Sequence, residues 1–109
     1  QADEKWFNRL NEIIQENISN TEFSVDQLTR SVNMSRTLLY AKVKAVTGLT
    51  PNEFIRLVRL RKAAEYLAGN EYKINEICYM VGFNSPSYFA KCFQNQFGVL
   101  PKDFINNTN

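Results

Sequence analysis

Residues 74–101 read INEICYMVGFNSPSYFAKCFQNQFGVLP, and the order of signals within this stretch decides the fold class. Its first part carries apolar residues at the spacing of one helix face: Ile74, Ile77 and Val81. Gly82 comes next, and glycine adopts the left-handed backbone of a tight turn without steric cost. Ser85 then has the side chain of a helix N-cap, and Gly98 marks the end of the helix that Ser85 begins. The stretch therefore predicts two helices joined by a tight turn.

The chain contains this pattern twice. Residues 22–34 match residues 71–83 at an offset of 49, and residues 35–48 match residues 85–98 at an offset of 50. Asn84 is the inserted residue that changes the offset. Because turn signals and apolar positions recur together, one unit present in two copies explains the pattern better than two unrelated amphipathic helices.

A further signal repeats after each unit. GLTPNEFI (48–55) and GVLPKDFI (98–105) each combine a glycine that stops one helix with a proline that begins the next, and Thr50 is placed to cap the first of these. We therefore expect an all-α fold of about seven helices, with two helix-turn-helix subdomains joined by a long linker helix. The expected divisions are an N-terminal amphipathic helix that packs on the first unit (1–20), the first helix-turn-helix (21–50), the linker helix (51–69), and the second helix-turn-helix with a C-terminal helix (70–109).

The N-terminal helix and the linker both show apolar stripes. The N-terminal stripe consists of Trp6, Leu10, Ile13, Ile14 and Ile18. The linker stripe consists of Phe54, Leu57, Val58, Leu60, Ala64 and Leu67. At about 1.5 Å per residue, residues 51–68 of the linker span roughly 27 Å, and we expect the helix to end at Gly69 and Asn70. We interpret Arg59 and Arg61 on this helix as structural or solvated rather than as ligand contacts.

Side chains advance by about 100° per residue along a helix, so the second helix of each unit has two distinct faces. We call the apolar face, which we expect to be buried, the dry face, and the face that we expect to be exposed to solvent the wet face. In the first unit the dry side consists of Leu39, Val43 and Val46. Its wet side consists of Thr37, Ala41 and Lys44, with Tyr40 on the flank. In the second unit the dry side consists of Phe89 and Phe93, and the wet side of Ser87, Lys91 and Gln94.

The net charge of +2 is unevenly distributed. Residues 35–62 carry seven cations and one acid, whereas residues 1–34 have a net charge of −3 and residues 63–109 a net charge of −1. A basic middle indicates an anionic partner for one face of the molecule, with a solvated helix surface as the alternative explanation.

The chain lacks the residues that several classes of protein function require. The chain has no histidine, no Gly-rich phosphate loop and no nucleophile elbow, so we expect no enzyme activity, no cofactor and no metal site. Cys78 and Cys92 lie among apolar residues, which favours buried free thiols in the reducing cytoplasm. No apolar run is long enough to span a bilayer, so we expect no membrane contact by this fragment. Because the chain begins at Gln1, we expect it to be part of a longer protein.

Over about residues 20–105 the chain resembles the AraC family of DNA-binding domains. The resemblance rests on RLRKAAEYL in the linker, on the stretch quoted first, and on the shared G-x-x-P-x-x-F-I ends. It implies that the second helices of the two units, at about 35–47 and 85–97, lie in successive major grooves of double-stranded DNA. The segment MSRTLLYAKVKAVTGLTPNEFIRLVRLRKAA, together with the N-terminal helix, resembles the output domain of hybrid two-component regulators. That role implies a sensor or receiver part in the same full-length chain, with RNA polymerase as a further partner.

The resemblance also implies which residues contact DNA. By position they are Arg36, Thr37, Tyr40, Ala41 and Lys44 in the first unit, and Asn84, Ser85, Ser87, Tyr88, Lys91 and Gln94 in the second. Ala41 departs from the family, in which many members carry a long polar side chain at this position; alanine offers a base only a methyl group. Pro86 likewise replaces a potential contact with a ring, and Asn33 replaces the usual turn glycine. We therefore expect much of the affinity to come from phosphate contacts. The alternative is a helical protein-interaction domain that has lost DNA binding.

Overall fold

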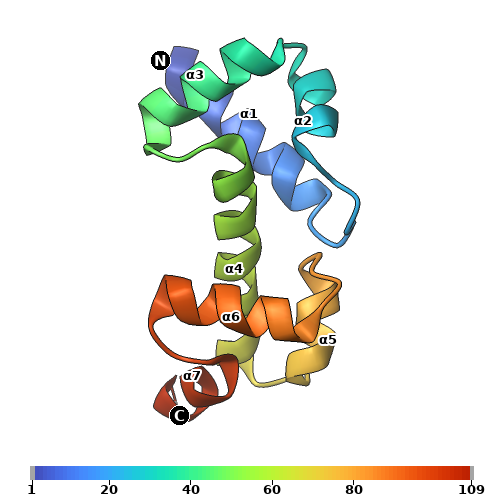
Figure 1. Cartoon of the computed structure of the whole chain (residues 1–109), viewed down its shortest axis with the longest axis vertical. Coiled ribbons are helices and arrows are strands. Elements are labelled where there is room, and N and C mark those ends of the chain that lie inside the picture. Colours follow the sequence, from blue (N-terminus) through green and yellow to red (C-terminus); the bar gives the residue numbers. More distant parts are fainter. Residues whose placement is uncertain (1, 109) are drawn as a thin grey trace. The chain divides into compact units, whose positions relative to one another are not determined.

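The computed structural model describes the backbone of residues 2–108 and the side chains of residues 4–105, and within that range it contains seven α-helices and no strand (Figure 1). The helices are α1 (Ala2–Glu16), α2 (Val25–Val32), α3 (Arg36–Thr47), α4 (Pro51–Gly69), α5 (Ile74–Met80), α6 (Pro86–Phe97) and α7 (Pro101–Thr108). The expected all-α class is confirmed. Gln1 and Asn109, the outer limits of the first and last expected divisions, lie outside the described residues.

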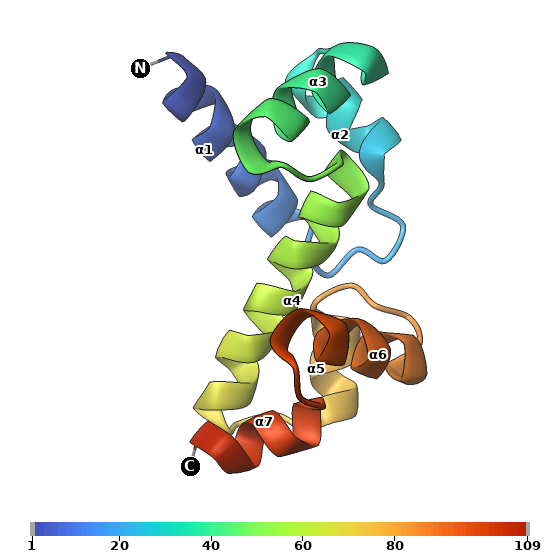
Figure 2. The ribbon, with the colours of Figure 1, turned by 60° about the vertical axis from the view of Figure 1, so that its left-hand side comes forward.

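The chain folds into two compact units, and the first contains α1, α2, α3 and the part of α4 up to Val58. Figure 2 shows these helices gathered around the start of α4. The buried apolar residues of this unit are Leu10, Ile13, Ile14, Phe23, Val25, Leu28, Leu39, Val43, Phe54, Ile55 and Val58. The rings of Phe7 on α1 and Phe54 on α4 lie 5.4 Å apart between centroids, so α1 covers the start of α4 as well as α2.

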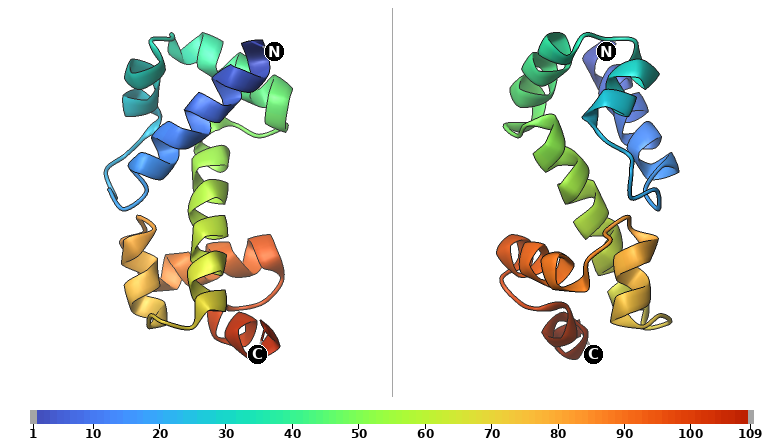
Figure 3. Two further views of the ribbon diagram at one scale, coloured as in Figure 1. Left: turned by 180° about the vertical axis from the view of Figure 1, so that it is seen from behind. Right: turned by 45° about the vertical axis from the view of Figure 1, so that its right-hand side comes forward.

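The second unit contains Ile18–Thr21 and the chain from Arg59 onward, with α5, α6 and α7 around the end of α4 (Figure 3). The buried residues of its hydrophobic core are Leu60, Ala63, Leu67, Ile77, Cys78, Val81, Phe83, Phe89, Cys92 and Phe93. Aromatic rings connect α6 to α7, because the centroid of Phe93 lies 4.6 Å from that of Phe97 and 5.4 Å from that of Phe104. These rings fix α6 on the core by one face only.

The tight turns confirm the internal repeat at the level of single hydrogen bonds. In the first unit the backbone N–H of Met34 donates to the carbonyl of Thr29 (3.1 Å), and Asn33 has the left-handed φ of 54°. In the second unit the N–H of Phe83 donates to the carbonyl of Cys78 (3.0 Å), and Gly82 has a φ of 94°. The offset is 49 residues for donor, acceptor and left-handed residue alike. This bonding pattern satisfies the last carbonyls of each first helix and turns the chain towards the second.

The predicted helix boundaries have their expected caps. Ser35 Oγ accepts a hydrogen bond from the N–H of Leu38 (3.1 Å), and Ser85 Oγ accepts one from the N–H of Tyr88 (3.3 Å). Gly48 and Gly98 end α3 and α6 in left-handed conformations, with φ of 77° and 81°. At the start of α4, Thr50 Oγ1 accepts from the N–H of Glu53 (3.2 Å), and Glu53 Oε1 accepts from the N–H of Thr50 (2.8 Å). At its other end the left-handed residue is Asn70, one position after Gly69.

Burial differs from the sequence pattern at three places. Val46, expected on the dry side of α3, is 48% exposed: it points in nearly the same direction as Leu39, but two turns further along the helix. Ile18 packs against the core of the second unit instead of the first, because α1 ends at Glu16 and Ile18 is not part of its stripe. On α4, Ile55 and Ala63 are buried, whereas Leu57 and Ala64 are half-buried.

Arg59 is a buried structural residue of the second unit, as expected, and 7% of it is exposed. Its Nη1 donates to the carbonyls of Ile18 (2.5 Å) and Val81 (2.8 Å), and its Nη2 donates to the carbonyl of Asn20 (3.2 Å). Burial lowers the pKa of this guanidinium. A Cβ atom on Gly82 would lie 1.4 Å from Arg59 Nη1 and 2.3 Å from the carbonyl oxygen of Ile18. Glycine at this turn therefore provides both the positive φ and the space for the guanidinium.

Candidate nucleic-acid interface

The solvent face of α3 carries the residues that the sequence placed there. Leu39 and Val43 are fully buried on one side of the helix, and Thr37, Ala41 and Lys44 are exposed on the other. Ser35 begins the helix and Gly48 ends it, so the rotation of this face relative to the core is defined at both ends. The centre of the face consists of two small side chains that bear methyl groups and one lysine.

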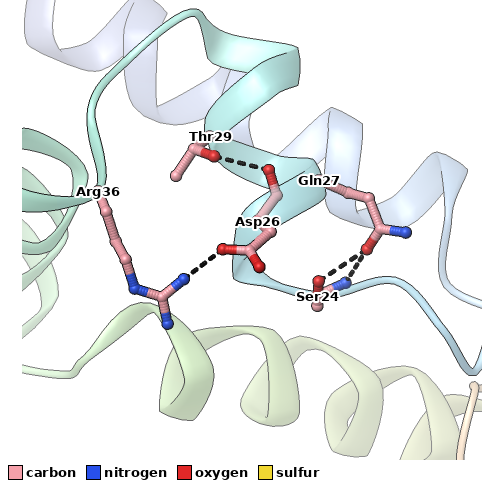
Figure 4. Close-up of polar contacts among 5 residues, drawn as sticks. All are labelled: Ser24, Asp26, Gln27, Thr29 and Arg36. Atoms are coloured by element: carbon pink, nitrogen blue, oxygen red, sulfur yellow. Dashed lines mark hydrogen bonds and ion pairs between the residues drawn. The ribbon is translucent and has the colours of Figure 1, made fainter.

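Arg36 lies beside this face but is engaged within the domain (Figure 4). Its Nη1 donates to Asp26 Oδ1, and its guanidinium lies 5.8 Å from the ring centroid of the half-buried Tyr40. Asp26 sits in the first turn of α2, next to Ser24, whose N–H and hydroxyl both donate to Gln27 Oε1 at 2.6 and 2.8 Å. The arginine is thus partly neutralised, and Tyr40 has a cation over its ring.

Lys42 also points away from the wet face. Its Nζ lies 4.6 Å from the ring centroid of Trp6 on α1, within cation–π distance. It is one of four cations in residues 35–62 that have partners inside the protein. The others are the buried Arg59, the paired Arg36, and Lys62, whose Nζ lies 3.7 Å from Glu65 Oε1. The positive charge that this segment offers to an external partner is therefore smaller than its net charge of +6 indicates.

The solvent face of α6 is more polar than that of α3. Ser87, Lys91 and Gln94 are exposed, opposite the fully buried Phe89 and Phe93. Tyr88 is 50% exposed at the edge of this face, and its ring centroid lies 6.0 Å from that of Phe83.

The other two predicted DNA contacts of the second unit lie in the turn before α6. Asn84 is exposed, and Ser85 is half-buried. Ser85 Oγ accepts the capping hydrogen bond from Tyr88 and lies 3.2 Å from Ser87 Oγ. Its hydroxyl oxygen is therefore used to cap α6. Ser85 fixes the start of this helix instead of adding a polar group to its exposed face.

Two residues outside the predicted site interact with its neighbouring cations in a way that the sequence did not predict. Asp26 on α2 forms an ion pair with Arg36, and the ring of Trp6 on α1 forms a cation–π contact with Lys42. Asp26 reads locally as an acid in a first helical turn, and Trp6 as a member of an apolar stripe. Neither pattern signals the cation that the tertiary fold brings to it.

The described residues contain no group of three or more histidine, cysteine or acidic side chains suited to a metal ion. Burial raises the pKa of the Cys78 thiol, and its Sγ lies 3.8 Å from the carbonyl oxygen of Phe83. Among the described helices, none combines the length and apolar character needed to cross a membrane.

Two helix-turn-helix units, each presenting one exposed helix face, define a class of DNA-binding domain. A family model described as "Helix-turn-helix domain" matches residues 28–107. The chain is 42% identical over 104 residues to histidine kinase P4 of Formosa agariphila, covering 95% of this chain and 8% of that protein. It is 34% identical over 98 residues to the HTH-type transcriptional regulator MtrA of Neisseria gonorrhoeae, covering 88% and 33%.

A solved structure agrees with these relatives. The C-terminal domain of AraT, a response regulator from Geobacillus stearothermophilus, is 26% identical and superposes with a TM-score of 0.84 over 94% of this chain and 84% of that one. The chain belongs to the AraC-type helix-turn-helix family, whose function is DNA-binding transcription regulation. It spans only 8% and 33% of the lengths of the two relatives named above.

Proposed function

We propose that this chain is the sequence-specific DNA-binding domain of a bacterial transcription regulator, and that α3 and α6 each enter a major groove. The observation that carries the proposal is the exposed face of each second helix, held in the same way by a serine cap, a glycine stop and a buried opposite side. A major groove admits one α-helix, and a helix held by one face presents the other to base edges.

The contacting residues divide by chemistry. Lys44 and Lys91 supply positive charge for phosphates or guanine edges, and Ser87 and Gln94 supply hydrogen bonds. Tyr40, Tyr88 and Asn84 flank the two faces. Ser85 acts through its cap, and Arg36 acts by neutralising Asp26, which would otherwise repel the DNA backbone.

The rest of the regulator is part of the same proposal. One relative is named a histidine kinase and one similar structure belongs to a response regulator, so we place a sensor or receiver part in the same full-length chain. RNA polymerase is the partner through which such a regulator acts, and the cytoplasm is where its DNA lies. The domain needs no cofactor for this role and performs no reaction of its own.

Selection of bound sequences from random duplex DNA, followed by fluorescence anisotropy across a salt series, tests the proposal. Four of the seven cations of residues 35–62 are engaged internally, so three remain, and Lys91 on α6 adds a fourth. We therefore expect about three to four phosphates to be neutralised, which gives a log–log slope of roughly −3 to −4. Lys44→Ala and Lys91→Ala should each weaken binding and reduce the slope by about 1, without a change in melting temperature. Lys5→Ala, which removes another exposed lysine, on α1, is the matched control.

The competing function, a helical domain that binds a protein and not DNA, makes the opposite prediction. It is favoured by the small number of cations on the two faces, where α6 carries Lys91 as its single basic residue. If selection enriches no sequence and anisotropy shows no binding at low salt, the DNA proposal fails and the competing function replaces it.

A further inference from the structure

The two helices that we propose to enter the major groove, α3 and α6, are called the reading helices below. They carry different side chains at corresponding positions of the repeat. At the offset of fifty, Thr37 corresponds to Ser87, Ala41 to Lys91 and Lys44 to Gln94. These corresponding residues are all exposed, and in each helix they lie opposite a fully buried apolar pair. Two of the three α3 side chains, Thr37 and Ala41, carry a methyl group, although Thr37 also carries a hydroxyl. None of the three α6 side chains has a methyl group, and they end in a hydroxyl, an ammonium and an amide.

The longer polar side chains of α3 do not change this picture. Arg36 is paired with Asp26 and lies over the ring of Tyr40, and Lys42 lies over Trp6. The centre of the face that α3 presents is therefore formed by Thr37 and Ala41, with Lys44 one turn beyond.

The major groove offers a partner for such methyl groups. Thymine is the base that presents a C5-methyl there, and alanine and the threonine methyl make apolar contact with it. Lysine pairs instead with O6 and N7 of guanine, and glutamine pairs with adenine. Resting on the proposed function, we infer that α3 reads thymine methyl groups through Thr37 and Ala41, whereas α6 reads hydrogen-bonding edges through Lys91 and Gln94. The recognised DNA then has a thymine-dependent half and a half that depends on purine acceptors.

Deoxyuridine tests the first half, because it differs from thymidine only in lacking the C5-methyl. In the selected duplex each thymine is replaced in turn, and affinity is measured by anisotropy. We expect a loss of about fourfold at each contacted thymine, which is the effect of one buried methyl group. These positions should cluster in one half of the site. In the other half of the site, replacing guanine with 7-deazaguanine, which lacks the N7 acceptor, should weaken binding. Replacing thymine with deoxyuridine in that half should leave the affinity unchanged.

Variants assign the contacts to residues. Thr37→Ser removes one methyl group, keeps the hydroxyl and introduces the residue that occupies the matched position of α6. With this variant, thymine and uracil at one position should bind equally, whereas the parent distinguishes them about fourfold. Ala41→Gly should do the same at a second position; because glycine weakens a helix, its melting temperature is measured and the comparison is made between the two DNAs, not between the two proteins. Lys91→Ala should remove the effect of 7-deazaguanine.

Val46→Ala is the matched control. Val46 is 48% exposed on the same helix and loses a larger apolar group, but it points about 180° away from Thr37 and about 140° away from Ala41. This variant should keep the full distinction between thymine and uracil. The inference is overturned if the parent binds its selected site yet tolerates uracil at every position, or if Thr37→Ser and Ala41→Gly both retain the parent's distinction. A parent that selects no sequence at all overturns the proposed function, and this inference with it.

Discussion

The ion pair of Arg36 and Asp26 controls how much positive charge α3 presents. Both side chains are largely exposed, so the pair adds little to stability, in the range of about 0–1 kcal/mol. Asp26→Asn removes the acid and leaves the guanidinium for a phosphate. We expect tighter DNA binding at low salt and a log–log salt slope steeper by about 0.9 per added contact, measured by anisotropy.

Glu12→Gln is the control for this prediction. Glu12 pairs with Arg9 on α1 at 3.4 Å, also in an exposed position, so the substitution removes the same charge from a helix that carries none of the predicted DNA contacts. A slope that is the same for Asp26→Asn as for the parent would show that Arg36 already contacts DNA or never does.

Arg59 joins three backbone carbonyls in the second unit, and its removal should be costly. Arg59→Met keeps most of the apolar stem but leaves the carbonyls of Ile18, Asn20 and Val81 without their guanidinium. We expect a loss of about 2–4 kcal/mol in the free energy of unfolding, measured by urea denaturation. Arg61→Met, on the same helix but exposed, should change it by less than about 0.5 kcal/mol. Equal effects of the two substitutions would contradict a structural part for Arg59.

At the scale of single elements, the start of α4 should respond to pH through Glu53. The hydrogen bond from the backbone N–H of Thr50, followed by that of its hydroxyl, lowers the pKa of Glu53 below its ordinary value of 4.5. A carboxyl whose folded pKa is depressed stabilises the fold above its unfolded pKa, and this contribution disappears as the pH falls through the folded pKa.

Glu53→Gln isolates this effect, because glutamine keeps the accepting oxygen of a capping box without the titration. Between about pH 5 and pH 3 the melting temperature of the parent should fall more steeply than that of the variant. Glu71→Gln, an exposed acid in the loop after α4, is a control that should follow the parent. Parallel curves for parent and Glu53→Gln would rule out a pH-dependent cap.

At the scale of the whole molecule, one continuous helix contains residues of both units, and this bears on how they meet DNA. α4 has 19 residues, which correspond to about 28 Å. Major-groove faces one helical turn apart lie about 34 Å, or some 10 bp, from each other. We expect one copy of the chain to protect about 20 bp without a palindrome, because its two reading helices differ.

Footprinting on the selected site and on a variant with about 5 bp inserted at its centre tests this expectation. A half-turn insertion rotates one half-site to the far side of the duplex, so protection should shrink to one half and affinity should fall. An insertion of about 10 bp is the control for spacing without rotation. Equal affinity for the parent site and the half-turn variant would mean that the two units do not read DNA together.

Much of the fold could be predicted from the sequence because its signals are local. The left-handed turns at Asn33 and Gly82, the caps at Ser35 and Ser85 and the stops at Gly48 and Gly98 depend on backbone dihedrals and on hydrogen bonds between residues three to five positions apart. The repeat strengthened each of these predictions, since the same signal occurs twice. The exposed faces of α3 and α6 follow from the same helical period, and most of the predicted site residues do lie on them.

Tertiary structure alone decided which charged groups those faces present. Arg36 meets an acid ten positions earlier in the chain, Lys42 meets a tryptophan on α1, and Arg59 meets a carbonyl 41 positions away. Ile18, expected on the apolar stripe of the N-terminal helix, likewise packs against the core of the second unit. Helical periodicity gives the direction of a side chain on its own element, but its partner depends on which distant segment packs there. The sequence by itself therefore determined the two helix-turn-helix units and their wet faces, and packing between distant segments decided how much charge each face retains.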